Sequence, residues 1–316
     1  MNDAAMFQIA TTRAPASTTR RMWAAMVGQT ARTPICPALP RLDGRLAVVT
    51  GATGGIGAEI ARGLARRGAE LVLPCRNPQR GVAAAEALRR EFGPSCVVHS
   101  IALELSDLGT VAPAVEAIAR VAAGRPIDLL VENGGVWPTA YARSAQGYEI
   151  AFAVNVLSHF ALRRRLSEAG LLPRTRVVVV TGDIYVSESA CSEDFVWRGA
   201  LGGKRAYSRS KLGNVWIAFE LARRQPELDV FVVHPGVVAT NLGGDAGRIG
   251  NALKRRLMIS PEQGAQMPLV CATQPGLRRG GYYHNAFGLV DLPANDPALD
   301  AQAARRCWER CEELTG

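Results

Sequence analysis

The sequence predicts an α/β fold in which helices cover both faces of one parallel sheet, within a single domain. Two observations support this prediction. Short runs of apolar, largely β-branched residues recur along the chain, and longer stretches with the spacing of amphipathic helices lie between them. Strands and helices that alternate at these lengths are typical of a doubly wound sheet. A chain of 316 residues is long enough for one large domain of this kind.

The strands and helices can be placed from these runs and from the glycines, prolines and capping residues that bound them. Ligands of such a sheet bind beyond the carboxyl ends of its strands, so the residues that follow each strand are candidate site residues. The expected strands cover residues 46–50, 70–74, 96–103, 127–131, 176–181, 229–233 and 280–284. The expected helices cover residues 58–67, 78–92, 107–122, 147–165, 207–221, 261–273 and 296–314.

The composition excludes several classes of protein. No apolar run reaches the length of a membrane-spanning helix, so we expect no integral membrane span. The net charge of +9 comes with arginines scattered in pairs rather than clustered with aromatic residues, and we therefore expect no nucleic-acid partner. The seven cysteines form no C-x-x-C pair and show no ligand spacing, which predicts no metal site and a reducing, cytoplasmic location.

Residues 1–42 differ from the domain that we expect over residues 43–316. The first 40 residues carry four arginines against one acid, with many alanines, serines, threonines and prolines. We interpret this segment as a poorly ordered or loosely docked extension. The same composition also fits a targeting segment, a true start at Met22 or Met26, or a short helix at 22–27 in peripheral contact with a membrane.

A glycine-rich turn follows the first strand and opens the first helix. Glycines in such a turn let the backbone approach a pyrophosphate, and the N-terminus of the helix supplies N–H donors and a positive dipole end. A turn with no ligand is the alternative. We predict that a dinucleotide cofactor binds here, through Gly51, Thr53, Gly55, Ile56 and Gly57.

The residues after the second strand indicate which dinucleotide binds. An NAD-binding fold places an acid there for the ribose hydroxyls, whereas this chain has Cys75-Arg76-Asn77. A guanidinium without a carboxylate favours a 2′-phosphate. We therefore expect NADP(H) rather than NAD(H), with Arg76 and Asn77 at the adenosine ribose. Arg76 as an ordinary surface charge is the alternative.

Tyr207 and Lys211 are the candidate catalytic pair. Residues four apart on a helix lie on one face, and an ammonium beside a phenol lowers the pKa of that phenol. A phenol poised in this way can pass a proton to or from a substrate oxygen. The spacing alone is common. It gains weight because the turn at 51–57, Asn133 and Thr181 are also expected at the carboxyl ends of the strands.

Together these residues resemble the short-chain dehydrogenase/reductase superfamily over residues 43–315, and most closely its retinol-dehydrogenase-like branch. The resemblance implies a Rossmann-type doubly wound parallel sheet. The matching motifs are Thr50-Gly51 with Gly55-Ile56-Gly57, Cys75-Arg76-Asn77, Asn155, Tyr207 with Lys211, and Pro235-Gly236 with Thr240.

The resemblance also implies a role for each matching residue. Tyr207 is then the acid/base, Lys211 binds the nicotinamide ribose and lowers the pKa of Tyr207, and Asn155 holds a water in the proton relay. The segment at 235–236 packs on the nicotinamide, and Thr240 meets its carboxamide. The other cofactor-binding residues that we infer are Glu104, Leu105, Asn133, Gly134, Pro235, Gly236 and Val238.

Three positions depart from the family pattern. Glu132 replaces an Asn, Glu104 replaces an Asp, and Gly182 stands at the position of the catalytic Ser. Glycine has no hydroxyl to hold the substrate oxygen. Thr181 can replace that hydroxyl only if the strand end twists or bulges, because adjacent strand residues face opposite ways. The other candidates, each of which needs a loop rearrangement, are Asp183, Tyr185 and Ser187.

Two functions fit this pattern. The first is an NADP(H)-dependent oxidoreductase that interconverts an alcohol and a carbonyl on a small lipophilic substrate. Its apolar site would lie near Trp137, Tyr185, Trp197 and a glycine-rich lid at 241–259. The second is a catalytically impaired NADP(H)-binding sensor or scaffold, which the missing Ser and Glu132 favour. The family is often dimeric or tetrameric, so a homo-oligomer is compatible with either function.

Overall fold

Nine strands form one sheet in the computed structural model, which describes residues 9–15, 20, 28–38, 40–239 and 258–316. The strand order is β1-β9-β8-β7-β6-β5-β2-β3-β4, and β2 to β8 pair in parallel. All seven expected strands are present: β2 (Leu46–Val49), β3 (Glu70–Cys75), β4 (Val98–Ala102), β5 (Leu129–Glu132), β6 (Arg176–Val180), β7 (Asp229–His234) and β8 (Tyr282–His284).

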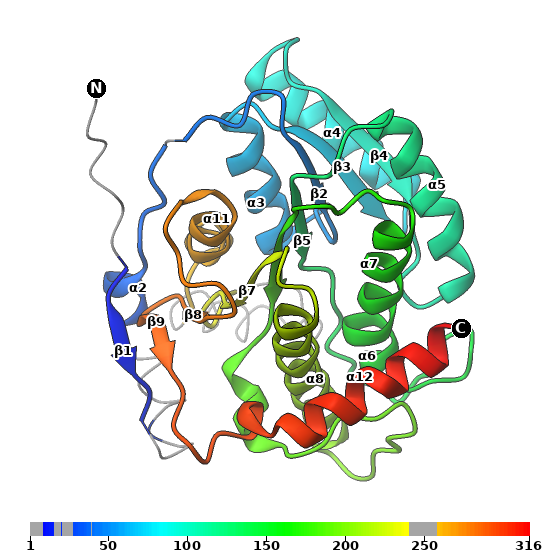
Figure 1. Ribbon diagram of the computed structural model, residues 1–316, viewed down its shortest axis with the longest axis vertical. Helices are drawn as coiled ribbons and strands as arrows, with labels where there is room; N and C mark the ends of the chain where they lie inside the picture. Colours follow the sequence, from blue (N-terminus) through cyan, green and yellow to red (C-terminus); the bar gives the residue numbers. More distant parts are fainter. Residues whose placement is uncertain (1–8, 16–19, 21–27, 39, 240–257) are drawn as a thin grey trace.

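Helices cover both faces of the sheet, which confirms the predicted doubly wound fold (Figure 1). Successive residues of a strand point to opposite faces, so Val48 and Ala47 of β2 belong to separate hydrophobic cores. Burial on both faces explains why the strands read as continuous apolar runs. The Ala47 core contains α3 (Gly55–Arg66), α4 (Pro78–Phe92) and α11 (Gln266–Thr273), and the Val48 core contains α5 (Val111–Ala122), α7 (Ser158–Glu168) and α8 (Gly202–Arg224).

The C-terminal helix adds a second layer outside α8 (Figure 1). It comprises η4 (Pro297–Leu299) followed by α12 (Ala301–Thr315). Trp308 of α12 packs edge-on against Phe160 of α7, with ring centroids 4.9 Å apart, and Trp216 Nε1 of α8 donates to Pro297 O at 2.9 Å. Among the described residues, none of the helices, α8 and α12 included, is both long and apolar enough to cross a bilayer.

The single helix that we expect at 147–165 is interrupted in the structure. It consists of α6 (Ile150–Phe152), a π-helical turn, η2 (Ala153–Leu157), and α7. π-Helical turns widen a helix locally and are frequent at functional sites. Asn155, a predicted site residue, lies at the centre of this turn.

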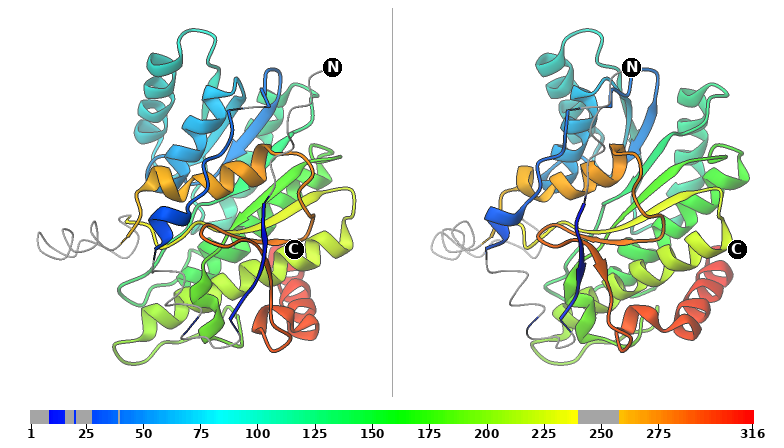
Figure 2. Two further views of the ribbon diagram at one scale, coloured as in Figure 1. Left: turned by 90° about the vertical axis from the view of Figure 1, so that its left-hand side faces the viewer. Right: turned by 60° about the vertical axis from the view of Figure 1, so that its left-hand side comes forward.

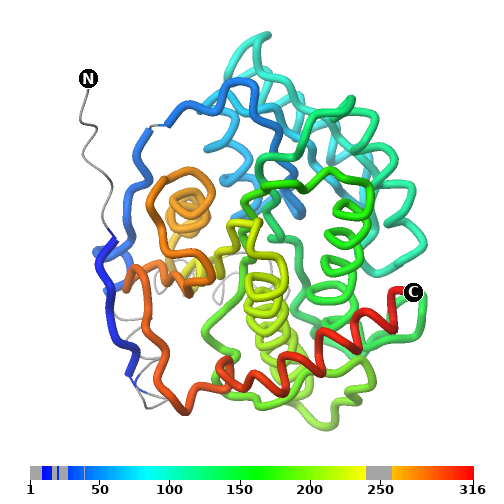
Figure 3. The backbone as a smooth tube through the Cα atoms, viewed as in Figure 1, coloured from blue at the N-terminus to red at the C-terminus, as the bar shows by residue number. Residues whose placement is uncertain are grey.

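The parts of the N-terminal extension that the structure describes contact the rest of the domain. β1 (Thr11–Arg13) pairs in parallel with β9 (Gly288–Asp291) at the edge of the sheet (Figure 2). After α2 (Gln29–Arg32), the chain runs along the outer side of α11 towards β2 (Figure 3). The short helix that we consider at 22–27 lies outside the described residues.

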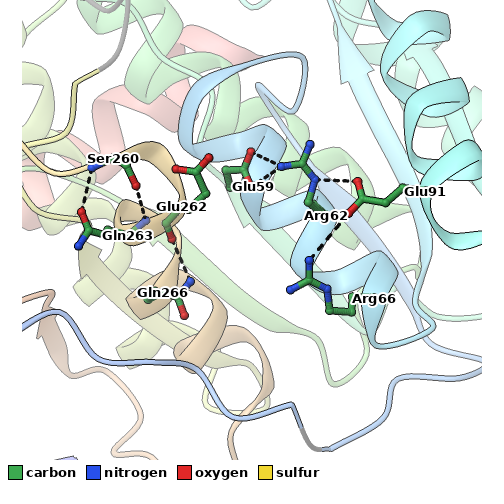
Figure 4. Close-up of polar contacts among 8 residues, drawn as sticks. All are labelled: Glu59, Arg62, Arg66, Glu91, Ser260, Glu262, Gln263 and Gln266. Atoms are coloured by element: carbon green, nitrogen blue, oxygen red, sulfur yellow. Dashed lines mark hydrogen bonds and ion pairs between the residues drawn. The ribbon is translucent and has the colours of Figure 1, made fainter. Parts of the chain in front are cut away.

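Figure 4 shows two polar clusters, one that joins α3 to α4 and one that caps the helix beginning at Pro261. Arg62 of α3 bridges Glu59 of the same helix and Glu91 of α4, with N–O distances of 2.7 and 2.9 Å. Ser260 and Gln263 form a capping box at the start of α10 (Pro261–Gly264), which packs beside α3. The residue before this box, Ile259, pairs in parallel with Val238, so α10 also holds the segment that follows β7.

Candidate active site

The carboxyl ends of β2 and β5 meet where the strand order reverses, and Thr50 joins them. The backbone N–H groups of Asn133 and Gly134 donate to Thr50 Oγ1 at 3.0 and 2.9 Å. The Asn133 side chain also donates to Thr50 O at 3.1 Å. The crevice of a doubly wound sheet opens at this reversal. Asn133 and Gly134 therefore lie where the sequence predicts, and they tie the two strands together.

The glycine-rich turn is shaped by close approaches of the backbone. Gly51 has φ +68°, and a Cβ there would lie 2.7 Å from Gly134 Cα. A Cβ at Gly57 would lie 2.3 Å from Gly51 O. Neither position can accept a side chain, so residues 51–57 present backbone to the crevice at the N-terminus of α3. This cradle fits the pyrophosphate of a dinucleotide.

One arginine contacts this cradle and another follows the neighbouring strand, and the sequence analysis missed the first of them. Arg76 follows β3 with its side chain 76% exposed, and its Nε is 3.6 Å from Glu104 Oε2. The Arg80 guanidinium donates to Thr53 O at 3.2 Å, which places a second positive charge on the turn. Asn77 Oδ1 accepts from Arg80 N at 2.9 Å, so the Asn77 side chain caps α4.

Leu105 and Glu104 lie next to the cradle on the side of β4. Leu105 Cδ1 is 2.8 Å from the position that a Cβ at Gly134 would take. Glu104 Oε1 accepts from Ser106 N at 2.9 Å, so this carboxylate holds its own loop as well as facing Arg76. The longer side chain of Glu104, which departs from the family pattern, is thus engaged by groups of the protein.

Asn155 organises the loop over the catalytic helix. Its Oδ1 accepts from Val136 N at 2.7 Å, and its Nδ2 donates to Val136 O at 3.0 Å and to Ser210 Oγ at 2.8 Å. The π-helical turn directs this side chain away from α7 and towards α8. Asn155 therefore lies beside the helix that carries Tyr207, and its amide holds the chain next to Trp137.

Tyr207 and Lys211 are buried on one face of α8, with exposed fractions of 8% and 4%. Lys211 Nζ lies 5.4 Å from the centroid of the Tyr207 ring and donates to Val180 O at 3.1 Å. The phenol ring stacks on Trp137, with centroids 4.4 Å apart and planes 15° apart. The two candidate catalytic groups thus lie together at the carboxyl end of β6.

Burial, rather than the neighbouring ammonium, controls the pKa values of both groups. Burial lowers the pKa of Lys211 to about 8 and raises the pKa of Tyr207 well above its usual value. The sequence-based expectation of a lowered Tyr207 pKa is wrong, because desolvation penalises the phenolate more than the ammonium favours it. The phenol is consequently protonated at neutral pH and suited to donate a proton.

Gly182 lies beside the phenol, as the alignment with the family predicts. A Cβ on Gly182 would be 3.9 Å from Tyr207 Oη and 3.9 Å from Lys211 Cγ. The hydroxyl that the family has at this position is therefore absent from the point where it would meet the substrate oxygen. No side chain of residue 182 occupies that space.

The candidate replacements for the missing hydroxyl are engaged elsewhere. Thr181 Oγ1 donates to Lys211 O at 2.8 Å, so Thr181 ties β6 to α8 and its hydroxyl does not point along the crevice with Tyr207. Tyr185 Oη donates to Asp296 at 3.0 Å, and Ser187 Oγ donates to Ile184 O at 2.8 Å. The Asp183 carboxylate accepts from Tyr282 Oη beneath the site.

Asp183, His234 and His284 form a buried cluster beneath Gly182, and their ligand-type atoms lie within 4.8 Å of one another. Ala286 N donates to His284 Nδ1 at 2.9 Å, and Asp183 N donates to His234 Nδ1 at 3.2 Å. A histidine that binds a metal through one ring nitrogen usually donates from the other. Here both Nδ1 atoms accept, so the arrangement fits a polar support for residues 182–183 better than a metal centre.

The segment after β7 returns towards the glycine-rich turn. Pro235 is buried, and Val238 Cγ2 is 2.6 Å from the position that a Cβ at Gly264 of α10 would take. Ile56 Cγ1 is 3.3 Å from the same position. The predicted residues Pro235, Gly236 and Val238 are thus brought to the cradle. Thr240 and most of the proposed lid at 241–259 lie outside the described residues.

Glu132, which departs from the family pattern, forms a buried ion pair. Its Oε1 accepts from Arg163 Nη1 of α7 at 2.6 Å, and both side chains are less than 5% exposed. A buried carboxylate is stable when a well-placed cation compensates its charge. The charge of Glu132 is therefore balanced within the protein and does not face the crevice.

Aromatic residues from two loops cover the N-terminal end of α8. Trp197 lies against Gly202 and Gly203 and meets Tyr141 edge-on, with ring centroids 6.0 Å apart. Trp137, in the same loop as Tyr141, stacks on the phenol itself, and we call these three rings the apolar wall. Tyr185 does not belong to it: the expectation that this residue lines the site is wrong, because its ring is fully buried and its hydroxyl is bound to Asp296.

Replacing Lys211 by Met is expected to stabilise the fold. Below pH 8 the lysine is charged in the folded and the unfolded chain, so the cost of burying its charge is fully present. Between pH 8 and 10.5 the unfolded chain binds more protons, so this cost falls as the pH rises. In urea unfolding, the free energy of unfolding of Lys211→Met should exceed that of the wild type by about 2 kcal/mol at pH 7, and this difference should shrink towards pH 10.

The exposed Lys204 on the same helix provides the matched control. Lys204→Met should change the free energy of unfolding little at either pH. Destabilisation by Lys211→Met at pH 7 would show that the hydrogen bond to Val180 outweighs the cost of burying the charge.

Comparison with known proteins connects this geometry to a family. The family model described as short chain dehydrogenase matches residues 45–248. Dehydrogenase/reductase SDR family member 13 of Bos taurus is 35% identical over 305 residues, which cover 90% of this chain and 77% of the relative. Retinol dehydrogenase 14 of Mus musculus is 31% identical over 87% of each chain. Polyprenol dehydrogenase of Mus musculus is 35% identical over 89% of this chain and 86% of the relative.

Solved structures share the fold over most of the chain. An uncharacterized protein from Mycobacterium paratuberculosis superposes with a TM-score of 0.68 at 31% identity, covering 89% of this chain and 98% of that chain. An alcohol dehydrogenase from the archaeon Thermococcus sibiricus, complexed with 5-hydroxy-NADP, has a TM-score of 0.60 at 24% identity, covering 76% and 95%. At that identity the second likeness concerns the fold alone.

Proposed function

The chain belongs to the short-chain dehydrogenase/reductase superfamily and to its retinol-dehydrogenase-like branch, and on this premise we propose an NADP(H)-dependent oxidoreductase that interconverts an alcohol and a carbonyl on a small lipophilic substrate. The observation that supports the proposal most is the buried pair Tyr207 and Lys211, which lies at the carboxyl end of the sheet beside the glycine cradle. That position is where a cofactor on the cradle and a substrate would meet.

The cradle and the two arginines favour NADP(H). The backbone of residues 51–57 would hold the pyrophosphate, and Arg76 and Arg80 would face the 2′-phosphate that distinguishes NADP(H) from NAD(H). Glu104, the nearest carboxylate to Arg76, bonds Ser106 N and faces the guanidinium, so it is poorly placed to select ribose hydroxyls. The nicotinamide, when bound, would supply or accept the hydride.

Tyr207 would move the proton in this reaction. Because burial keeps its phenol protonated at neutral pH, Oη can donate to a carbonyl oxygen during reduction. The positive charge of Lys211 would stabilise the phenolate that donation leaves. Asn155 would keep Trp137 and its loop in place over the phenol, through the two bonds to Val136.

The apolar wall of Trp137, Trp197 and Tyr141 favours a lipophilic substrate. The names of two relatives, a retinol dehydrogenase and a polyprenol dehydrogenase, refer to lipophilic alcohols and agree with this choice. The seven cysteines are free thiols, which fits a reducing compartment such as the cytoplasm.

A catalytically impaired NADP(H)-binding sensor or scaffold is the second candidate. The specific observation in its favour is Gly182, which leaves no hydroxyl at the position of the family's catalytic Ser. The preserved Tyr207 opposes it, because a protein that only binds the cofactor has no need of a buried phenol placed to donate a proton. Lys211 does not separate the two candidates, since its expected contact with the nicotinamide ribose serves both.

The proposal is tested by following NADPH and NADH oxidation with a panel of aliphatic, aromatic and retinoid-like aldehydes and ketones. We expect turnover with NADPH on at least one apolar carbonyl. Binding of NADPH without turnover of any substrate would favour the sensor or scaffold. If NADPH does not bind, both candidates are wrong.

The choice of cofactor is tested in the same assay with Arg76→Ala. Loss of a charge that faces the 2′-phosphate should raise the KM for NADPH about tenfold, corresponding to about 1.4 kcal/mol, and should leave the KM for NADH unchanged. Arg90→Ala, which removes an exposed arginine at the far end of α4, is the control. An equal effect of Arg76→Ala on both cofactors would show that Arg76 does not select between them.

A further inference from the structure

Gln29, in the N-terminal extension, is bonded to the turn that follows β7. The residue is 2% exposed. Its Oε1 accepts from Val237 N at 3.0 Å, and its Nε2 donates to Val237 O at 3.2 Å. One amide side chain therefore satisfies both backbone groups of a residue 208 positions away, much as a neighbouring strand would.

The turn at 235–238 is enclosed by this contact. On its other side, Ile259 N donates to Val237 O at 3.0 Å, and Ala239 N donates to Ile259 O at 2.9 Å. Gly236 has φ +94°, and a Cβ there would lie 3.2 Å from Gln29 Oε1 and 2.7 Å from Ile259 Cδ1. The backbone of the turn is thus fixed between α2 and the segment that precedes α10.

Another contact anchors the end of α2 in this position. Asn285 Nδ2, beyond β8, donates to Thr33 Oγ1 at 2.8 Å. A separate contact, in which Cys36 N donates to Gln266 Oε1 of α11 at 2.9 Å, holds the chain beyond α2 rather than the helix itself. A buried amide that bonds a turn from an anchored segment limits how far that turn can move. Residues 28–38 lie outside the region that the family model matches, which begins at residue 45.

We propose that Gln29 is a positioning residue that holds the 235–238 turn in the conformation that receives the nicotinamide half of the cofactor. The N-terminal extension is then a working part of the cofactor site. The inference rests on the proposed function, because the cofactor assignment comes from it. Gln29 itself acts only through the backbone of Val237.

The test compares Gln29→Met with Gln266→Met. Both variants replace an amide that bonds the backbone, but Gln266 anchors Cys36 away from the turn. Two probes separate the halves of the cofactor: NADPH contains the nicotinamide, and adenosine 2′,5′-bisphosphate contains only the adenosine half. We expect Gln29→Met to raise the Kd of NADPH about tenfold, because two hydrogen bonds of the turn are lost, and to change the Kd of the bisphosphate less than about twofold.

Hydrogen exchange provides a readout that needs no cofactor. In the cofactor-free protein, peptides that contain Val237 should exchange faster in Gln29→Met than in the wild type, and Gln266→Met should leave their exchange unchanged. Gln29→Ala should repeat both effects if Met does not fit the buried position.

The possible outcomes separate this inference from the proposed function. An unchanged Kd of NADPH in the Gln29 variants, or equal weakening of both probes, would overturn the positioning role. If the wild type binds neither probe, the proposed function fails. The exchange of Val237 then decides by itself whether Gln29 holds the turn, and unchanged exchange would overturn that role.

Discussion

Replacing Tyr207 by Phe is expected to lower kcat/KM for carbonyl reduction by about 10²–10⁴-fold, the usual contribution of a positioned proton donor. The change removes a single oxygen. The ring still stacks on Trp137 and still fills the buried space on α8, so the fold and NADPH binding should be retained. Steady-state kinetics with NADPH and the best carbonyl of the panel measure the effect.

Tyr283→Phe is the matched control. Tyr283 is also buried, and its hydroxyl donates to Arg278 O at 3.0 Å, away from the catalytic helix. Its loss should leave the kinetics unchanged. A Tyr207→Phe enzyme that equals the wild type on every substrate turned over would rule out Tyr207 as the acid/base.

The parallel core could be predicted because its signals are local. Strands buried on both faces, such as β6, are continuous apolar runs, and the capped helices between them keep their spacing. β1 could not be predicted in this way. Its sequence, Thr11–Arg13, has no apolar alternation. It becomes a strand only because it pairs with β9, where Thr11 lies opposite Leu289, 278 positions further along the chain.

The same distinction between local signals and distant contacts applies to the candidate site. The glycine turn and the pair Tyr207 and Lys211 carry motifs whose chemistry is visible in the residue types. The direction of the Tyr207 pKa is not visible, because it depends on how completely the fold removes the phenol from water. The roles of Arg80 and Gln29 depend on contacts with residues far along the chain, so no local pattern identifies them.

Gly182, unlike Arg80 and Gln29, was identified from the sequence, and the structure places it beside the Tyr207 phenol without the hydroxyl of the family's catalytic Ser. Replacing Gly182 by Ser is expected to raise kcat/KM about 10²-fold, near the lower end of what one preorganised donor contributes. The backbone accepts the change: its φ of −158° and ψ of 137° are extended, and the nearest atoms to a new Cβ are 3.9 Å away. The same kinetic assay measures the gain.

Gly182→Ala is the control that shows whether the hydroxyl causes the rise in kcat/KM. Ala adds the same Cβ without a hydroxyl, so any benefit from filling space or stiffening the chain appears in both variants, whereas hydrogen bonding appears only in Ser. If kcat/KM of the Ser variant exceeds that of the Ala variant by about 10²-fold, the wild-type site lacks one hydrogen-bond donor to the substrate oxygen. If the Ser variant does no better than the Ala variant, the substrate oxygen is already held by another group of the site.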